Sequence, residues 1–389
     1  MRANYDRLPY PAVESQKRFV PRWDMAPMQW IQAMWQPSQK TPARILVAGC
    51  GTGNEVFALH RAFPHSEIVG IDFSRRSLAV ARQLHRRFFP SAGIEFIRAD
   101  LVQRDLVNKI GANYDYISCH GVLSYLSEPK KAIAALERCL VHGGALYLGV
   151  NGSRHFSQEW RPALKDFGFE PRKFKDEPHL RRTLRLFDAL ADRQAGAISD
   201  LGPDFLAGDL FGPLINNWSL GRWRRICAKS GLFLRGSYSA HRGLRAAINE
   251  DLFDQLMPRN RADAHAIVEK IAPSSFHYLI FTRQAERGLP WNWVSALGKY
   301  ALTRTPLYRV RWPSQQSGRK RLVDLVLTSR STNTRVDVVL PRNAAKAFRA
   351  SDSVTSLRNL LGSQISRETR KSIYLLYLLG AINLHLVSG

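Results

Sequence analysis

Between about residues 44 and 150, short apolar runs alternate with stretches that repeat their apolar residues at helical spacing. The apolar runs are RILVAG, EIVGID, IEFIRAD, YDYISCH and GALYLGV. Helical patterns are found from about Asn54 to Phe63 and across RRSLAVARQLHRRF and EPKKAIAALERCL. This alternation is typical of parallel strands joined by crossover helices. It predicts a doubly wound α/β sheet that binds its ligand at the carboxyl ends of the strands.

Later in the chain the pattern is interrupted and then resumes. Residues 151–215 are helical, basic and rich in aromatic side chains, which predicts a helical cap insertion whose Trp160, His155 and His179 shape a pocket. A helix around SLGRWRRICAKSG, helices between about residues 249 and 271, and the strands LFLRGSYS and FHYLIFTRQ follow. The two added strands predict a sheet of seven strands.

A separate unit is predicted from about residue 286 to residue 389. This stretch contains 17 basic and 5 acidic residues. The alternating runs RLVDLVLTS and TRVDVVLP predict a hairpin, and three helical segments follow at about 342–350, 353–362 and 366–379, before the short strand GAINLHLV. This order resembles a small winged-helix module and predicts an α+β fold for the unit.

The chain is strongly basic, with 57 Lys and Arg against 32 Asp and Glu, a net charge of +25 and an isoelectric point near 10.4. Such a charge attracts nucleic acid, anionic membranes and acidic proteins. It also fits a solvated cationic surface, because the basic residues are scattered rather than gathered in one run. Charge alone therefore leaves the partner open.

Cysteine spacing and terminal composition narrow the class of protein. The four cysteines form no C-x-x-C pair and have no metal-ligand spacing with histidine, so neither a disulfide framework nor a metal site is predicted. The N-terminus lacks the apolar core of a secretory signal, and no run of about 18 apolar residues predicts a membrane span. We therefore expect a cytoplasmic protein.

A glycine turn follows the first apolar run, in the stretch ILVAGCGTGNEVFAL. Gly49, Gly51 and Gly53 form G-x-G-x-G, whereas a dinucleotide fingerprint requires G-x-G-x-x-G. LVAGCGTG, followed about 20 residues later by GIDFS, resembles the cofactor motif of class I S-adenosylmethionine-dependent methyltransferases. The resemblance implies a Rossmann-like sheet and a backbone that approaches S-adenosylmethionine closely, as glycine permits.

The same resemblance assigns the carboxylates that follow the second and third strands. Asp72 would accept hydrogen bonds from the ribose hydroxyls, although it could instead cap the helix near Ser74, itself a competing cap. Asp100 would bind the adenine amino group, or it would be a solvent-exposed carboxylate in a loop. The implied cofactor-binding set is Gly49, Cys50, Gly51, Gly53, Asp72, Phe73, Asp100, Leu101 and His120.

Candidates for proton transfer come from two segments. SCHGVLSYLSEP resembles the family segment that leads along the cofactor into the substrate pocket, and it contains His120 and Tyr125. With Tyr10 these are the candidate catalytic residues, because a hydroxyl or protonated amine must lose a proton on methylation. His120 also fits a purely structural role, and a base is optional when positioning supplies much of the catalysis.

The resemblance narrows to a bacterial methyltransferase group often fused to tetratricopeptide repeats. It rests on YDRLPYP, with Tyr5, Pro9, Tyr10 and Pro11, on DFLAGDLFGPLINNWSL and on GLFLRG, and covers about residues 4 to 283. The repeats themselves are absent from the sequence. The predicted domains are an N-terminal lid segment (1–43), a methyltransferase domain (44–285, with the cap at 151–215) and a basic accessory domain (286–389).

Three functions remain open at this point. The first is methyl transfer from S-adenosylmethionine to a small molecule or protein. The second is methylation of nucleic acid, held by the basic residues 286–389, in which RETRK at 367–371 would present Arg367, Arg370 and Lys371 to the phosphate backbone. The third is a non-enzymatic protein that binds the cofactor and regulates a partner.

Overall fold

The computed structural model describes residues 8–12, 19–35, 41–170, 173–192, 197–247, 259–284, 300–312, 322–330, 335–351, 355–357, 361 and 365–386 of the chain. The chain divides into two compact units. The first comprises residues 1–25, 37–232 and 273–283, and the second comprises residues 26–36, 233–272 and 284–389. Tyr5 and residues 285–299 lie outside the described part.

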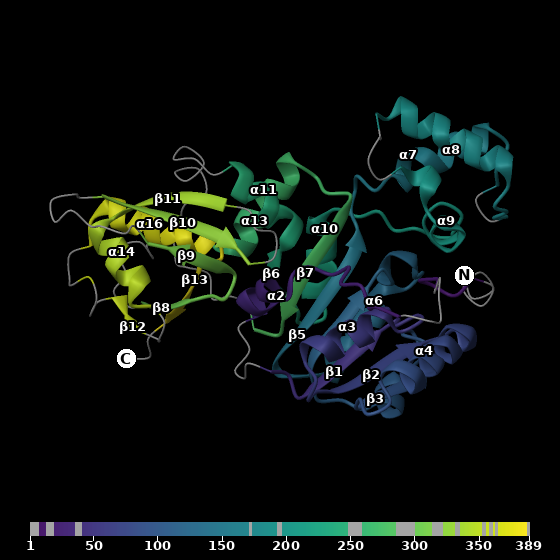
Figure 1. Cartoon of the computed structure of the whole chain (residues 1–389), viewed down its shortest axis with the longest axis horizontal. Helices are drawn as coiled ribbons and strands as arrows, with labels where there is room; N and C mark the ends of the chain where they lie inside the picture. Colours follow the sequence, from purple (N-terminus) through teal and green to yellow (C-terminus); the bar gives the residue numbers. More distant parts are fainter. Residues whose placement is uncertain are drawn as a thin grey trace. The chain divides into compact units, whose positions relative to one another are not determined.

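The central sheet has seven strands in the order β3-β2-β1-β4-β5-β7-β6 (Figure 1). Pairing is parallel from β3 to β5, and β7 runs antiparallel to β5. The strands are β1 (Arg44–Ala48), β2 (Glu67–Asp72), β3 (Ile94–Arg98), β4 (Tyr114–His120), β5 (Leu140–Asn151), β6 (Phe233–Ser237) and β7 (Phe276–Thr282). The predicted seven-stranded Rossmann-like sheet is thereby confirmed.

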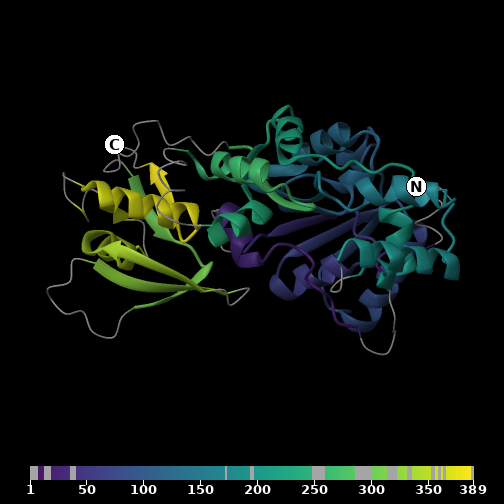
Figure 2. The ribbon, with the colours of Figure 1, turned by 90° about the horizontal axis from the view of Figure 1, so that it is seen from above.

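The helices of the first unit alternate with these strands, and Figure 2 shows helices on both sides of the sheet. They are α3 (Asn54–Ala62), α4 (Arg75–Phe88), α5 (Leu106–Ile110), α6 (Pro129–Cys139) and α10 (Leu220–Ala228). Ile45, Leu46 and Val47 of β1 are fully buried, as expected for a central strand covered on both faces. The apolar runs therefore form strands because both of their faces are removed from water.

The predicted cap insertion is helical and has an apolar core of its own. It contains α7 (Ser157–Asp166), α8 (Pro178–Leu190), the short 3-10 helix η2 (Ile198–Asp200) and α9 (Pro203–Asp209). Trp160, Leu184, Leu206 and Phe211 pack together in this core. The buried carboxylate of Asp188 accepts hydrogen bonds from the amides of Ile198 and Ser199, at 2.9 and 2.8 Å. The segment is therefore an ordered helical layer following β5.

The second unit contains two antiparallel sheets, in the orders β11-β10-β9 and β12-β8-β13. Their strands are β8 (Tyr300–Arg304), β9 (Tyr308–Arg311), β10 (Leu322–Ser329), β11 (Arg335–Pro341), β12 (Thr355–Ser356) and β13 (Ile382–Leu386). Its helices are α2 (Met28–Trp35), α11 (Tyr238–Ala247), α13 (Arg261–Ile271), α14 (Arg342–Arg349) and α16 (Arg367–Leu378). The predicted α+β character and the β10–β11 hairpin are confirmed.

Two details of this unit differ from the sequence pattern. Two separate sheets occur where a single hairpin and a closing strand were expected. Residues 355–356, expected within a helix over 353–362, form strand β12 instead, and most of the rest of that segment lies outside the described residues. Short apolar runs fit a helix or a strand equally well, so spacing alone did not separate the two.

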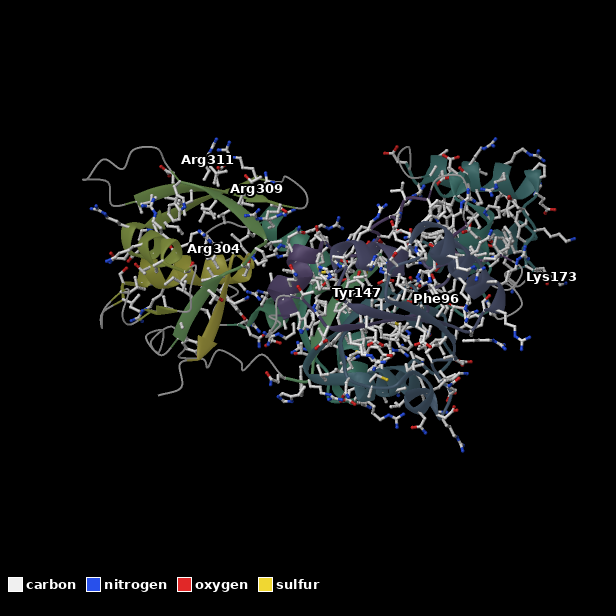
Figure 3. The ribbon with its side chains drawn as sticks, turned by 60° about the horizontal axis from the view of Figure 1, so that its bottom comes forward. Phe96, Tyr147, Lys173, Arg304, Arg309 and Arg311 are labelled. Carbon is white, nitrogen blue, oxygen red and sulfur yellow. The ribbon has the colours of Figure 1, made fainter. Side chains whose placement is uncertain are left out.

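Arginines are exposed on one sheet of the second unit. Arg309 and Arg311 of β9 are exposed, and Figure 3 labels both together with Arg304 of β8. In the interior of the unit, the guanidinium of Arg261 is fully buried and donates to the carbonyls of Tyr377 and Ile382. Some arginines of this unit are therefore exposed to solvent, whereas Arg261 is buried and has a structural role.

Candidate functional site

The glycine turn joins β1 to α3 at the carboxyl edge of the sheet. Its three glycines have φ angles of +79°, +53° and +91° at Gly49, Gly51 and Gly53, a region that favours glycine. The amides of Gly49 and Cys50 both donate to the carbonyl of Ile71, at 2.7 and 2.8 Å. These bonds fix the turn against the end of β2.

The turn also has protein on its outer side. A Cβ atom on Gly51 would lie 2.2 Å from the carbonyl oxygen of Tyr10, and one on Gly49 would lie 2.3 Å from a methyl group of Val122. Glycine is therefore required for close approach of the N-terminal segment and of the segment after β4. By contrast, a Cβ on Gly121 (φ +68°) would meet no atom within 4 Å, so the space beside the end of β4 is open.

Asp72 lies at the end of β2 and binds the turn directly. Its Oδ2 accepts from the amide of Gly51 at 3.0 Å, and its Oδ1 accepts from the amide of Ser74 at 2.8 Å. Ser74 caps α4 by accepting from the amide of Ser77 at 3.2 Å. These bonds hold the carboxylate of Asp72 between the glycine turn and the start of α4.

The residues predicted after β3 lie at the same edge, because Asp72 pairs with Arg98 across β2 and β3. The Oδ1 of Asp100 accepts from the amide of Val102 at 3.1 Å, and neighbouring Leu101 is buried. Phe73 is partly exposed, and its carbonyl accepts from the guanidinium of Arg98 at 3.1 Å. The fold therefore brings the glycine turn, Asp72 and Asp100 to one edge of the sheet.

His120 ends β4 among aromatic side chains. Its ring is nearly parallel to that of Tyr147, with an interplanar angle of 12°, and its Nδ1 lies 3.2 Å from the Tyr147 hydroxyl. Burial lowers the pKa of His120 to about 4, so its ring is neutral at pH 7. A Cβ on Gly149 would lie 2.4 Å from this ring. This neutral, tightly packed ring is a poor general base.

Tyr125 belongs to a cluster of polar side chains beyond the ends of β4 and β5. It lies on the 3-10 helix η1 (Leu123–Tyr125), and its hydroxyl donates to Oδ1 of Asp209 on α9. The side-chain nitrogen Nδ2 of Asn151, the last residue of β5, lies 3.4 Å from the same hydroxyl. Nε2 of His155 lies 3.9 Å from Oδ1 of Asp209. Burial raises the pKa of Asp209 to about 7.

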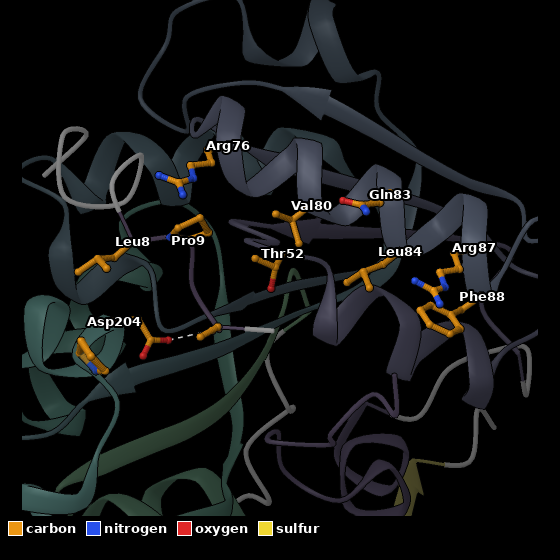
Figure 4. Close-up of a pocket in the computed structure, with 12 residues that line it drawn as sticks. Leu8, Pro9, Thr52, Arg76, Val80, Gln83, Leu84, Arg87, Phe88 and Asp204 are labelled. Atoms are coloured by element: carbon orange, nitrogen blue, oxygen red, sulfur yellow. Dashed lines mark hydrogen bonds between the residues drawn. The ribbon is translucent and has the colours of Figure 1, made fainter. Parts of the chain in front are cut away.

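Tyr10 connects this cluster to the glycine turn. Its carbonyl accepts from the amide of Thr52 at 3.0 Å, and the amide of Ala12 donates to Oδ2 of Asp204 on α9 at 2.9 Å (Figure 4). Burial and the carboxylates of Asp209, Asp204 and Asp24 raise the pKa of the Tyr10 phenol, although 40% of the residue is exposed. The N-terminal segment around Tyr10 therefore bonds both the glycine turn and α9, the helix that ends at Asp209.

Residues 46–146 match the Methyltransf_12 family, described as a methyltransferase domain. The chain as a whole is similar in fold to PKMT2 from Rickettsia typhi, solved in complex with AdoHcy, with a TM-score of 0.57 and 14% identity over 95% of this chain and 78% of that one. The chain contains a class I methyltransferase domain. The predicted class and its cofactor, S-adenosylmethionine, are thereby confirmed, whereas the likeness to the repeat-fused group stays a prediction.

Characterised relatives of the methyltransferase domain differ in substrate. The malonyl-[acyl-carrier protein] O-methyltransferase of Paenibacillus is 30% identical over 34% of this chain and 49% of its own length. The trans-aconitate 2-methyltransferase of an Acidovorax species is 30% identical over 30% of this chain and 41% of its own length. The chain spans less than two thirds of the length of the curated relatives that it matches.

The edge of the methyltransferase domain fits S-adenosylmethionine. The open space beside Gly121 and the carboxylate of Asp72 suit a ligand that brings hydroxyl donors to the ends of β2 and β4. The glycine turn, Asp72, Phe73, Asp100 and Leu101 would hold the cofactor. When bound, it supplies a methyl group on a positively charged sulfur.

Glu55 of the methyltransferase domain was not among the predicted site residues. It occupies the first turn of α3, and its carboxyl accepts a hydrogen bond from the hydroxyl of Ser118 on β4. Burial, assisted by Asp24 and opposed by this hydrogen bond, raises the pKa of Glu55 to about 7. Burial and then the charges of Asp72 and Glu55 raise the pKa of neighbouring Cys50. In the sequence, Glu55 looks like an ordinary first-turn helix residue.

A cavity of about 350 Å³ lies between α4 and residues 8–12 (Figure 4). Thr52, Arg76, Arg87 and Asp204 contribute to its lining, together with apolar side chains such as Leu84. Asp72 and Asp100 do not line it. This cavity therefore adjoins the glycine turn from the side of α4 and is separate from the predicted cofactor contacts.

Metal-ligand groups and membrane-spanning helices are both absent from the described part of the chain. No group of three or more His, Cys, Asp or Glu side chains is arranged there to hold a metal ion. None of its helices combines the length and the apolar composition that a bilayer crossing requires.

Proposed function

We propose that the protein transfers the methyl group of S-adenosylmethionine to a small molecule or protein bound beneath the helical cap. One observation carries the proposal: the polar cluster around Asp209 lies beyond the carboxyl ends of β4 and β5, at the sheet edge of the glycine turn, and the backbone of residues 10–12 bonds both the turn, at Thr52, and helix α9, at Asp204. Class I sheets bind ligands at this edge, so an acceptor in the cluster lies next to a cofactor at the turn.

The names of the relatives support the general reaction without naming the acceptor. One acts on a malonyl group attached to a carrier protein, and another acts on trans-aconitate. These acceptors differ, and the similarity covers the cofactor-binding part of the chain. The acceptor of this protein must therefore be argued from its own cap residues.

Neither alternative function is favoured. On α16, Arg367 is exposed, but Arg370 and Lys371 are partly buried, so the helix offers less cationic surface than a recognition helix needs. A non-enzymatic regulator would not need a buried polar cluster beside the cofactor edge. Binding of nucleic acid or an acidic partner through residues 286–389 stays a prediction, testable by the salt dependence of binding.

The test is transfer of labelled methyl from S-adenosylmethionine into fractions of a cell lysate. We expect label in one fraction with the wild-type protein and at most a few per cent of it with Asp72→Asn. Asp105→Asn, an exposed carboxylate at the start of α5, is the matched control and should transfer label normally. Absence of label in every fraction, with cofactor binding verified, would contradict the proposed function.

A further inference from the structure

A cluster of hydrogen-bonded polar side chains at the end of β5 contains one acceptor oxygen without a donor among the described residues. Asn151 is fully buried, and its side-chain oxygen has no hydrogen-bond partner among the described residues. Its nitrogen lies 3.4 Å from the Tyr125 hydroxyl and 3.4 Å from Oδ1 of Asn217. The Tyr125 hydroxyl in turn donates to Asp209. A buried acceptor without a donor is costly, so this place suits a ligand that brings N–H or O–H groups.

The charges around Asp209 come from each element packed against it. Tyr125 approaches from η1, Tyr10 from the N-terminal segment, His155 from the start of the cap, and Asp204 lies on the same helix, α9. Within the described residues, His155 is the one basic side chain within 4 Å of the Asp209 carboxylate. In a protein of net charge +25, this carboxylate therefore has no Lys or Arg partner among the described residues.

His155 does not replace that cation. Its Nδ1 lies 2.7 Å from the hydroxyl of Ser157, which also accepts from the side-chain nitrogen of Asn217 at 3.0 Å. The distance of 3.9 Å between its Nε2 and Asp209 exceeds that of a hydrogen bond. The ring is thus held within the cap, and the Asp209 carboxylate still lacks a close positive partner.

We propose that the cluster formed by Tyr125, Asn151 and Asp209 binds the methyl acceptor as an amine, and that Asp209 takes a proton from it. The inference rests on the proposed methyl transfer and names its substrate class. A protonated amine brings a positive charge for the Asp209 carboxylate and N–H donors for the free oxygen of Asn151. An anionic acceptor would meet repulsion from the Asp209 carboxylate.

Methylation of the amine requires one proton transfer and one displacement at the methyl carbon. The bound ammonium gives one proton to Asp209, directly or through the Tyr125 phenol, and becomes a neutral amine. Its nitrogen lone pair forms a bond to the methyl carbon while the carbon–sulfur bond breaks, with that electron pair staying on sulfur as a neutral thioether. The positive charge passes to the methylated amine, and Asp209 later releases its proton to solvent.

Two features support this role for Asp209. Its raised pKa, about 7 through burial, lies where a group can both take and release a proton near neutral pH. Its carboxylate is fixed by the Tyr125 hydroxyl rather than by a competing cation. Burial lowers the pKa of His120, packed on Tyr147, to about 4, so His120 is a weaker base than Asp209.

The chemical nature of the methylated product tests the substrate class. The full-length protein and labelled S-adenosylmethionine are incubated with a fractionated cell lysate, and products are divided by stability. N-methyl groups survive acid hydrolysis as methylamines or N-methyl amino acids, whereas methyl esters release methanol in base. We expect acid-stable N-methyl products. Methyl esters, O-methyl ethers or C-methyl products would overturn the amine assignment while leaving methyl transfer intact, and absence of any transfer would overturn both.

Variants of Asp209 test its role with the amine fraction as the probe. Asp209→Asn should lower kcat/KM about 100-fold at pH 7. In the wild type, kcat/KM should rise with pH near pH 7, and in Asp209→Asn this rise should move toward the higher pKa of the amine itself. Affinity for S-adenosylmethionine should stay within about twofold. Asp209→Glu should recover part of the rate, and Asp166→Asn, an exposed cap carboxylate, should match the wild type. An unchanged pH profile in folded Asp209→Asn would refute the proton transfer.

Discussion

Replacing Glu55 with glutamine should stabilise the cofactor-free protein at alkaline pH. Burial raises the pKa of Glu55 from 4.5 to about 7, so the folded state holds a neutral carboxyl beside Ser118. A carboxyl with a raised folded pKa contributes its full stability below pH 4.5 and loses it as the pH rises through 7. Above pH 7 the fold must either bury a carboxylate or open, whereas glutamine stays neutral.

The magnitude follows from the two pKa values. The interval from 4.5 to about 7 corresponds to about 3 kcal/mol of unfolding free energy lost at high pH. Between pH 5 and pH 8.5 the loss is about 2.5 kcal/mol, because part of it already applies at pH 5. This is a large share of the 5–15 kcal/mol by which a typical domain is stable.

The assay is urea unfolding of the cofactor-free protein at pH 5 and pH 8.5. Between the two conditions, Glu55→Gln should lose about 2.5 kcal/mol less stability than the wild type. The matched control is Glu95→Gln on β3, whose carboxylate is exposed and whose replacement should leave the pH dependence unchanged. Equal pH dependence in wild type and Glu55→Gln would show that Glu55 is not a buried neutral acid and would refute the reasoning.

Three further predictions concern the cofactor edge and the second unit. Asp72→Asn should weaken S-adenosylmethionine binding at least about tenfold in calorimetry, because it removes a charged acceptor, and equal affinity would remove Asp72 from the site. Gly51→Ala should speed hydrogen exchange at the Thr52 amide by displacing the Tyr10 carbonyl, whereas Gly143→Ala, also at positive φ but in open space, should not. Burial, helped by the charge of Arg261, lowers the pKa of His265 to about 3, so the free energy of unfolding should fall below pH 6.5, by about 2 kcal/mol at pH 5. His265→Asn should not show this loss in urea unfolding. A loss of the same size in His265→Asn would contradict the assignment to His265.

Much of the fold follows from local patterns in the sequence. The apolar runs around Ile45 and Val47 predict strands because covering both faces of a parallel sheet requires uninterrupted apolar residues. The glycines at 49, 51 and 53 predict a turn of positive φ, and Asp72 follows the next strand at the matching edge. These features could be predicted from the sequence because each depends on neighbours within a few residues or on a regular alternation of strands and helices.

Other parts of the site depend on contacts between distant residues. Asp209 lies within the GDLFG segment, yet only the fold places it against Tyr125, 84 residues earlier, and near Tyr10. His120 stays a candidate base from the sequence, and only the fold packs its ring against Tyr147, where burial lowers its pKa to about 4. Glu55 gave no sign of a role because burial beside Ser118 is what sets its pKa.

The sequence by itself determined the alternation of strands and helices, the turn that approaches the cofactor and the carboxylate at its edge. The tertiary structure alone decided which side chains lose water and which charges face one another beneath the cap. The physical reason is that periodicity and turn geometry are encoded among near neighbours, whereas desolvation and the pKa values that it shifts arise from elements that meet only when the chain is folded.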